Sequence, residues 1–154
     1  MISDTIQKQI QQALKSHDEL RQTTLRLLSA SLHNAQIDKR AKLSEEEEII
    51  IVQKEVKKRI DAIVLYKRGG ALDRAKREEA EIIILKEFLP EEITAGELEK
   101  IVNDTILQLN ASSLSDMGKV IGAIKSKVGA RAQGAVIAQL VKEKLSEVVL
   151  KNVN

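Results

Sequence analysis

The segment Asp116–Gly134, DMGKVIGAIKSKVGARAQG, combines a helical apolar stripe with a high density of glycine and positive charge. Apolar residues recur at i, i+3, i+4, i+7 and i+11, which is the spacing of one buried helix face. These residues are Met117, Val120, Ile121, Ile124 and Val128. The segment therefore predicts an amphipathic helix, followed by a short basic break from Gly129 to Gly134.

Two glycines of this segment, Gly118 and Gly122, lie on a face beside the apolar stripe, with Lys125 on the same face. A glycine inside a helix costs about 1 kcal/mol relative to alanine. Without a Cβ, however, glycine lets another backbone approach the helix closely. Two interpretations are open: a neighbouring helix packs on the glycines while the lysines are solvated, or the face is bare and binds an anion.

The anion-binding interpretation assigns phosphate contacts to four cations and close approach to four glycines. The cations are Lys119, Lys125, Lys127 and Arg131, and the glycines are Gly118, Gly122, Gly129 and Gly134. The charge pattern is consistent with this interpretation, because two basic zones flank an acidic one. Segment 54–77 has nine Lys or Arg and three acids, 91–116 has six acids and one Lys, and 117–154 has seven cations and two acids. Such a distribution is typical of a modest polyanion binder, although solvated helix faces would show it too.

The composition is that of an ordinary globular protein, with 43% hydrophobic and 31% charged residues in a chain of 154. This length allows one good core or two small ones. The absence of cysteine excludes disulfides and thiolate metal sites. The first ten residues show no secretory signal, and the apolar runs are too short to span a bilayer. We expect a soluble, cytoplasmic protein with no membrane partner.

Helical periodicity runs through the chain and strand signals are nearly absent, so we expect an all-α fold. Four helices are expected in an N-terminal domain, 1–90, and three in a C-terminal domain, 91–154. The expected helix N-caps are Asp18, Ser44 with Glu47, and Thr94 with Glu97. Ser115 or Asp116 is expected to cap the glycine-containing helix. Gly69-Gly70 is expected to end the third helix. The first helix is expected to start after Ser3 or Asp4, and the fourth helix is expected over about 71–89.

The same periodicity predicts which side chains are buried. The expected inner faces include Leu14, Leu27, Ile60 and Leu109, whereas Lys57, Lys58 and Arg59 are expected to point away from the core. Glu45–Glu48 lie in the first turn of a helix, where carboxylates complement the helix dipole, so no metal is needed to explain them.

No catalytic residue, cofactor or metal site is predicted. His17 and His33 have no metal-ligand spacing and are expected at the surface. There is no phosphate-binding glycine motif after a strand, and serines 112, 113 and 115 are expected to cap and turn the chain. Tyr66 and Phe88 are the only aromatic residues, which argues against a stacking platform for single-stranded RNA.

Several motifs together resemble the GatB/YqeY family. These are D-M-G-K-V-I-G at 116–122, the segment from Lys127 through Arg131 to Gly134, the apolar and basic segment 136–145, Arg26-Leu27-Leu28, the S-E-E-E sequence from Ser44, and L-P-E-E at Leu89–Glu92. The resemblance covers essentially the whole chain and implies an all-α protein of two domains. The C-terminal domain is similar to the tail domain of the B subunit of the glutamine-dependent Asp-tRNA/Glu-tRNA amidotransferase. One departure is Gln133, where the family often has an acidic residue, so a weaker cap is expected for the last helix.

The resemblance implies a link to carbon–nitrogen ligases and a tail that contacts tRNA. None of the catalytic machinery of the amidotransferase is matched, so catalysis by this chain alone is not expected. The predicted function is a tRNA-binding accessory protein, with amidotransferase or synthetase components as further partners. The alternative is a protein-interaction adaptor whose Gly118 and Gly122 face receives a partner helix. Which tRNA is bound, and the oligomeric state, are left open by the sequence.

Overall fold

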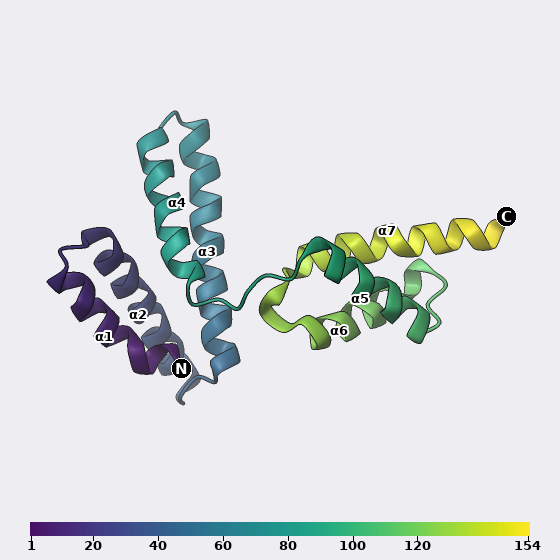
Figure 1. Ribbon diagram of the computed structural model, residues 1–154, viewed down its shortest axis with the longest axis horizontal. Helices are drawn as coiled ribbons and strands as arrows, with labels where there is room; N and C mark the ends of the chain where they lie inside the picture. Colours follow the sequence, from purple (N-terminus) through teal and green to yellow (C-terminus); the bar gives the residue numbers. More distant parts are fainter. The chain divides into compact units, whose positions relative to one another are not determined.

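The computed structural model describes residues 1–154 and contains seven α-helices, two short 3₁₀ turns and no strand (Figure 1). The all-α prediction is confirmed. The helices are α1 (Ile2–Lys15), α2 (Glu19–Lys39), α3 (Glu45–Arg68), α4 (Leu72–Lys86), α5 (Ala95–Gln108), α6 (Met117–Val128) and α7 (Gly134–Val153), with 3₁₀ turns η1 (Leu114–Asp116) and η2 (Gly129–Arg131). The chain divides into two compact units, Met1–Leu89 and Pro90–Asn154, which have separate hydrophobic cores.

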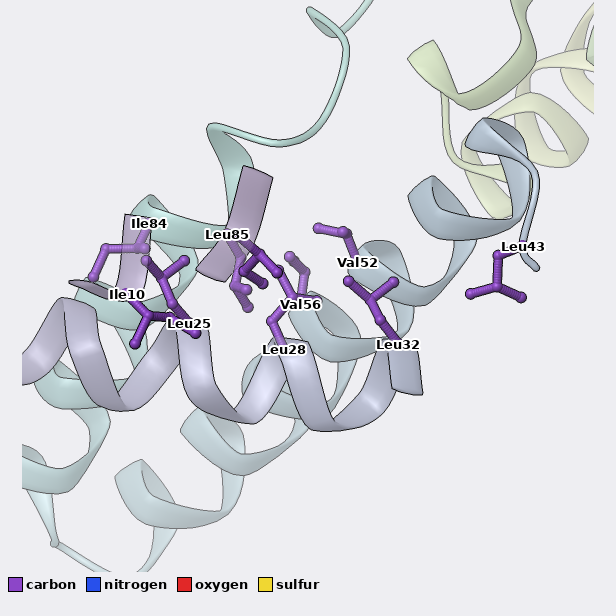
Figure 2. Packing of buried hydrophobic residues seen from close by; sticks show 10 residues of the cluster. Ile10, Leu25, Leu28, Leu32, Leu43, Val52, Val56, Ile84 and Leu85 are labelled. Atoms are coloured by element: carbon purple, nitrogen blue, oxygen red, sulfur yellow. The ribbon is translucent and has the colours of Figure 1, made fainter. Parts of the chain in front are cut away.

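The first unit consists of two helical hairpins, α1–α2 and α3–α4. Helix α2 joins them, because it packs against both α3 and α4. Figure 2 shows leucines of α2 facing aliphatic side chains of the other hairpin. The labelled core residues are Ile10, Leu25, Leu28, Leu32, Leu43, Val52, Val56, Ile84 and Leu85. Full burial of one such side chain contributes about 1.5–3 kcal/mol, so the hairpins are held together mainly by this cluster.

Four apolar residues expected inside are exposed: Leu14, Leu27, Ile60 and Leu109. These predictions were wrong because each helix is covered on one side only, and the covered side is narrower than the apolar stripe. In α2 the buried leucines are Leu25, Leu28 and Leu32, a stripe at i, i+3 and i+7 that leaves Leu27 outside. Near the end of α5, Ile106 takes the buried position expected for Leu109.

Glu48 caps a helix other than its own. It is fully buried, and its carboxylate accepts hydrogen bonds from the backbone N–H of Ile2 (2.6 Å), the backbone N–H of Ser3 (3.3 Å) and the Ser3 hydroxyl. The first N–H groups of a helix have no partner within the helix, so a carboxylate at this position stabilises the N-terminus. This cap explains why α1 begins at Ile2, earlier than predicted.

Arg59 is buried, contrary to the prediction that it points to solvent; it is only 6% exposed. Its guanidinium donates to Glu81 of α4 (2.9 Å) and to both the carboxylate and the backbone carbonyl of Glu55 (3.0 Å each). Ser31 of α2 donates to Glu55 as well (2.9 Å), so the network joins three helices. Burial acts to raise the pKa of Glu55, but hydrogen bonds from Lys58, Arg59 and Ser31 outweigh it, and the pKa lies below its ordinary value.

The predicted helix ends are largely confirmed. Asp18 accepts from the backbone of Arg21, and both capping boxes, Ser44 with Glu47 and Thr94 with Glu97, are formed. Gly69 ends α3, and Gly70 follows with a φ of 73°, which favours glycine. Helix α4 ends at Lys86 rather than at residue 89. Pro90 disfavours a helical conformation for the residue before it, which is consistent with this earlier end.

The second unit packs α5, α6 and α7 around the apolar stripe of α6. Val120, Ile124 and Val128 are buried, and Met117 and Ile121 pack against them, so the predicted stripe is confirmed. Helix α7 contributes Ile137, Val141 and Leu145, all fully buried. This packing leaves the opposite side of α6 at the surface.

Candidate nucleic-acid interface

The exposed side of α6 carries both helical glycines of the predicted site. A Cβ added at Gly118 or Gly122 would meet no atom within 4 Å beyond the neighbouring backbone of its own helix. The interpretation that another helix of this unit packs on the glycines is therefore wrong. Lys119, Lys125 and Ser126 share this exposed side, since residues of α6 advance by about 100° each. We call these five residues the open face.

Lys125 extends from the open face to the start of α7. A Cβ at Gly134 would lie 3.4 Å from both Cε and Nζ of Lys125, so the end of the lysine side chain lies against the first residue of α7. Gln133, at the N-cap position, makes no side-chain cap, and the first turn of α7 has no acidic residue. The expected weakness of this cap is confirmed. The positive end of the helix dipole thus lies next to a lysine ammonium.

Lys127 and Arg131 lie away from the open face. The ammonium of Lys127 donates to Thr105 Oγ1 (3.2 Å) and Gln108 Oε1 (3.0 Å) of α5. Arg131 donates from Nε to the carbonyl of Glu91 (3.4 Å). Its own carbonyl accepts from the N–H of Ile93 (2.9 Å). Of the four predicted cations, only Lys119 and Lys125 are brought together with Gly118 and Gly122.

Gly129 has a role in the backbone. Its φ of 56° and ψ of −132° end α6, and its N–H donates to the carbonyl of Lys125. Such a conformation is rare for residues with a Cβ, which explains the glycine without a ligand. Of the four predicted glycines, Gly129 is the one whose backbone conformation requires glycine, and Gly118 and Gly122 are the two with no atom near an added Cβ in helix α6.

Asp116 stabilises the loop before α6. Its carboxylate accepts from the backbone N–H groups of Ser112 (3.0 Å) and Ser113 (3.1 Å), whereas it makes no side-chain cap on α6. These hydrogen bonds, with a smaller contribution from the charge of Lys119, lower the pKa of Asp116. Asp116 therefore remains charged beside Lys119 and offsets part of the positive potential at this end of the open face.

Ser126 was not predicted as a site residue. It lies on the open face, and its hydroxyl donates to the carbonyl of Gly122 (3.1 Å). Its place four residues after Gly122 was the signal available in the sequence. The hydroxyl is exposed and retains its acceptor lone pairs.

The histidines and acidic side chains form no metal-ligand cluster. His17 and His33 are exposed, as predicted, and no three acidic or histidine side chains are grouped so that they could hold a metal ion. None of the seven helices is both long enough and apolar enough to cross a membrane.

A family model described as "Yqey-like protein" matches residues 3–145, which cover most of both units and the entire open face. The chain belongs to the YqeY-like family. Curated relatives include two yeast proteins named "Altered inheritance of mitochondria protein 41, mitochondrial". The relative from Lachancea thermotolerans is 32% identical over 95 residues, which cover 61% of this chain and 51% of the relative. The relative from Vanderwaltozyma polyspora is 31% identical over 107 residues, covering 64% and 57%. This YqeY-like chain spans about half the length of the curated relatives it matches.

Proposed function

We propose that this YqeY-like protein is a non-catalytic tRNA-binding accessory protein, associated with the glutamine-dependent Asp-tRNA/Glu-tRNA amidotransferase. The observation that supports the proposal is the open face: two uncovered glycines on a packed helix, with Lys119 and Lys125 beside them. Gly122 lies in the interior of α6, where a glycine reduces helix stability, and no contact within the unit accounts for either exposed glycine. The proposal places the protein in the cytoplasm with its tRNA.

The chemistry of the face is suited to a phosphate backbone. Lys119 and Lys125 provide charge for phosphate oxygens, and Ser126 provides a hydroxyl. Gly118 and Gly122 allow the sugar–phosphate chain to approach the helix more closely than side chains would permit. The unit has no aromatic residue, so recognition rests on shape and backbone contacts rather than on stacking of bases.

Binding of bulk tRNA across a salt series tests the proposal directly. For each phosphate contact that is lost, the slope of log K against log salt should flatten by about 0.7–0.9. We expect the Lys119→Ala/Lys125→Ala variant to bind tRNA more weakly. Its salt slope should be flatter by the amount that two phosphate contacts contribute. A matched control is Lys142→Ala/Lys151→Ala, which removes the same charge from exposed positions of α7 in the same unit. No binding at low salt, or equal losses in the two double variants, would contradict the proposal.

Alanine at the two glycines should separate stability from binding. Because an added Cβ meets no atom there, Gly118→Ala/Gly122→Ala should stabilise the second unit, by about 0.5–1 kcal/mol at Gly122 in the helix interior and by less at Gly118 in the first turn. The same Cβ atoms should hold the tRNA backbone away and weaken binding by about tenfold, or about 1.4 kcal/mol. Thermal unfolding followed by circular dichroism and tRNA affinity are the two measurements.

Gly96→Ala is the control for this pair. Gly96 is an exposed glycine of α5 with nothing within 4 Å of an added Cβ, and it lies outside the open face. The Gly96→Ala variant should bind tRNA with the same affinity as the native chain. Full affinity in the Gly118→Ala/Gly122→Ala variant would show that close approach plays no part.

The alternative proposal, a protein-interaction adaptor, is supported by the same uncovered glycines. In that case a partner helix takes the place of the RNA backbone. Gly118→Leu and Gly122→Leu should then abolish partner binding while the unit stays folded, and alanine at Lys119 and Lys125 should have no effect. The lysine variants therefore distinguish the two proposals.

A further inference from the structure

The α3–α4 hairpin has one side covered by α2 and one side uncovered. Ser31 of α2 bonds to Glu55, and Leu85 of α4 is completely buried in the core with the leucines of α2. Ile83 is two residues from Leu85, about 200° around the helix, and is 68% exposed. Figure 1 shows the turn between α3 and α4 standing clear of the α1–α2 hairpin.

An ion pair identifies the residues that share the uncovered side. Lys67 of α3 and Glu79 of α4 are joined at 2.8 Å across this side. Ile60 and Val64 precede Lys67 by seven and three residues, so they lie on its stripe of α3. Leu72 and Ile83 lie seven residues before and four after Glu79, on its stripe of α4. We call these four aliphatic residues the outer face.

The outer face is a seam of four exposed aliphatic residues, two from each helix of the hairpin. Ile60, Val64, Leu72 and Ile83 are 42%, 45%, 58% and 68% exposed, respectively. Ile60 and Val64 are four residues apart and are neighbours on α3, whereas Leu72 and Ile83 are eleven residues apart, about three turns of α4. No helix of this unit covers the seam, so a partner helix would complete a small bundle.

The charges around the seam indicate which charge a partner helix should carry. Arg68 and Lys76 are exposed there without an ion pair, whereas Asp61 is paired with Lys57 and Glu79 with Lys67. The border is therefore net positive. A second copy of this chain would place these cations against each other, which costs free energy. A helix with acidic residues beside its apolar stripe would pair with them.

We propose that the outer face of the α3–α4 hairpin docks an acidic amphipathic helix of a partner protein. The four aliphatic residues bury the apolar stripe of that helix, and Arg68 and Lys76 contact its carboxylates. This interaction surface lies in the first unit, whereas the proposed tRNA contact lies in the second. The two can therefore be abolished separately.

The test uses two synthetic helical peptides and the full chain. Both peptides carry leucine at the a and d positions of a heptad; one has glutamate at the flanking e and g positions, and the other has lysine. Fluorescence anisotropy should show that the glutamate peptide binds at least tenfold more tightly. Ile60→Ser/Val64→Ser should weaken this binding at least tenfold, and Lys76→Glu should reduce the preference for the glutamate peptide.

Leu65→Ser is the matched control, since Leu65 is exposed on the same helix about 100° from Val64. It should bind the glutamate peptide like the native chain, and circular dichroism should show all variants folded. The proposal is overturned if neither peptide binds, if both bind equally, or if Leu65→Ser weakens binding as much as the double variant. Self-association in sedimentation, or binding to tRNA or to anionic vesicles, that Ile60→Ser/Val64→Ser abolishes would also overturn it.

Discussion

Replacing Arg59 by alanine should destabilise the first unit by about 3–5 kcal/mol, because it leaves the buried carboxylates of Glu55 and Glu81 without their common partner. Removing one member of a buried ion pair costs far more than the pair itself contributes, since the remaining charges are still away from water. This loss of stability is expected although Arg59 belongs to neither the open face nor the outer face.

Urea unfolding provides the measurement. Tyr66 is the only tyrosine of the chain and there is no tryptophan, so tyrosine fluorescence reports on the first unit alone. Lys57→Ala is the control on the same helix. Its ion pair with Asp61 is exposed, and such pairs contribute only about 0–1 kcal/mol. A loss for Arg59→Ala no greater than that of the control would show that the buried network is not needed for stability.

Truncating Ile124 to alanine should destabilise the second unit by about 2–5 kcal/mol, which is the usual cost of such a cavity in a core. Ile124 is fully buried at the centre of the α6 stripe, and its core cluster shares no residue with that of the first unit. The effect should therefore be confined to the second unit.

Two probes separate the units in this experiment. Circular dichroism should show part of the helical signal lost earlier in urea, while Tyr66 fluorescence keeps its native midpoint. Ile124→Val is the graded control and should cost about 0.5–1.5 kcal/mol. A shift of the tyrosine transition together with the circular dichroism transition would show that the two units unfold as one.

Local features of this fold were predictable from the sequence, because they depend on residues within a single helix or at its end. The Ser44–Glu47 and Thr94–Glu97 capping boxes and the α6 stripe are examples. Arg59 and Glu48 were not predictable in the same way. Arg59 is held partly by Glu81, 22 residues away, and Glu48 by Ile2, 46 residues away, so their burial depends on how the helices pack.

In the candidate site, too, local spacing was predictable and helix packing was not. Helical spacing alone places Gly118, Gly122 and Lys125 on one face, and that grouping agrees with the structure. Spacing also puts Lys127 about 180° from Gly118, a separation that the prediction of a four-cation site ignored. That the glycines are uncovered could not be predicted, because it depends on where α5 and α7 pack against α6.

The cap that Glu48 provides for α1 has a consequence for the order in which the chain folds during synthesis. Residues 2 and 3 leave the ribosome long before Glu48 does, so the start of α1 has no acceptor for its N–H groups at first. An isolated helix of 14 residues is marginal in water. The nascent α1–α2 segment should therefore stay frayed at the start of α1 until α3 has emerged and docked, so residues 2 and 3 become ordered only after Glu48, which is made later.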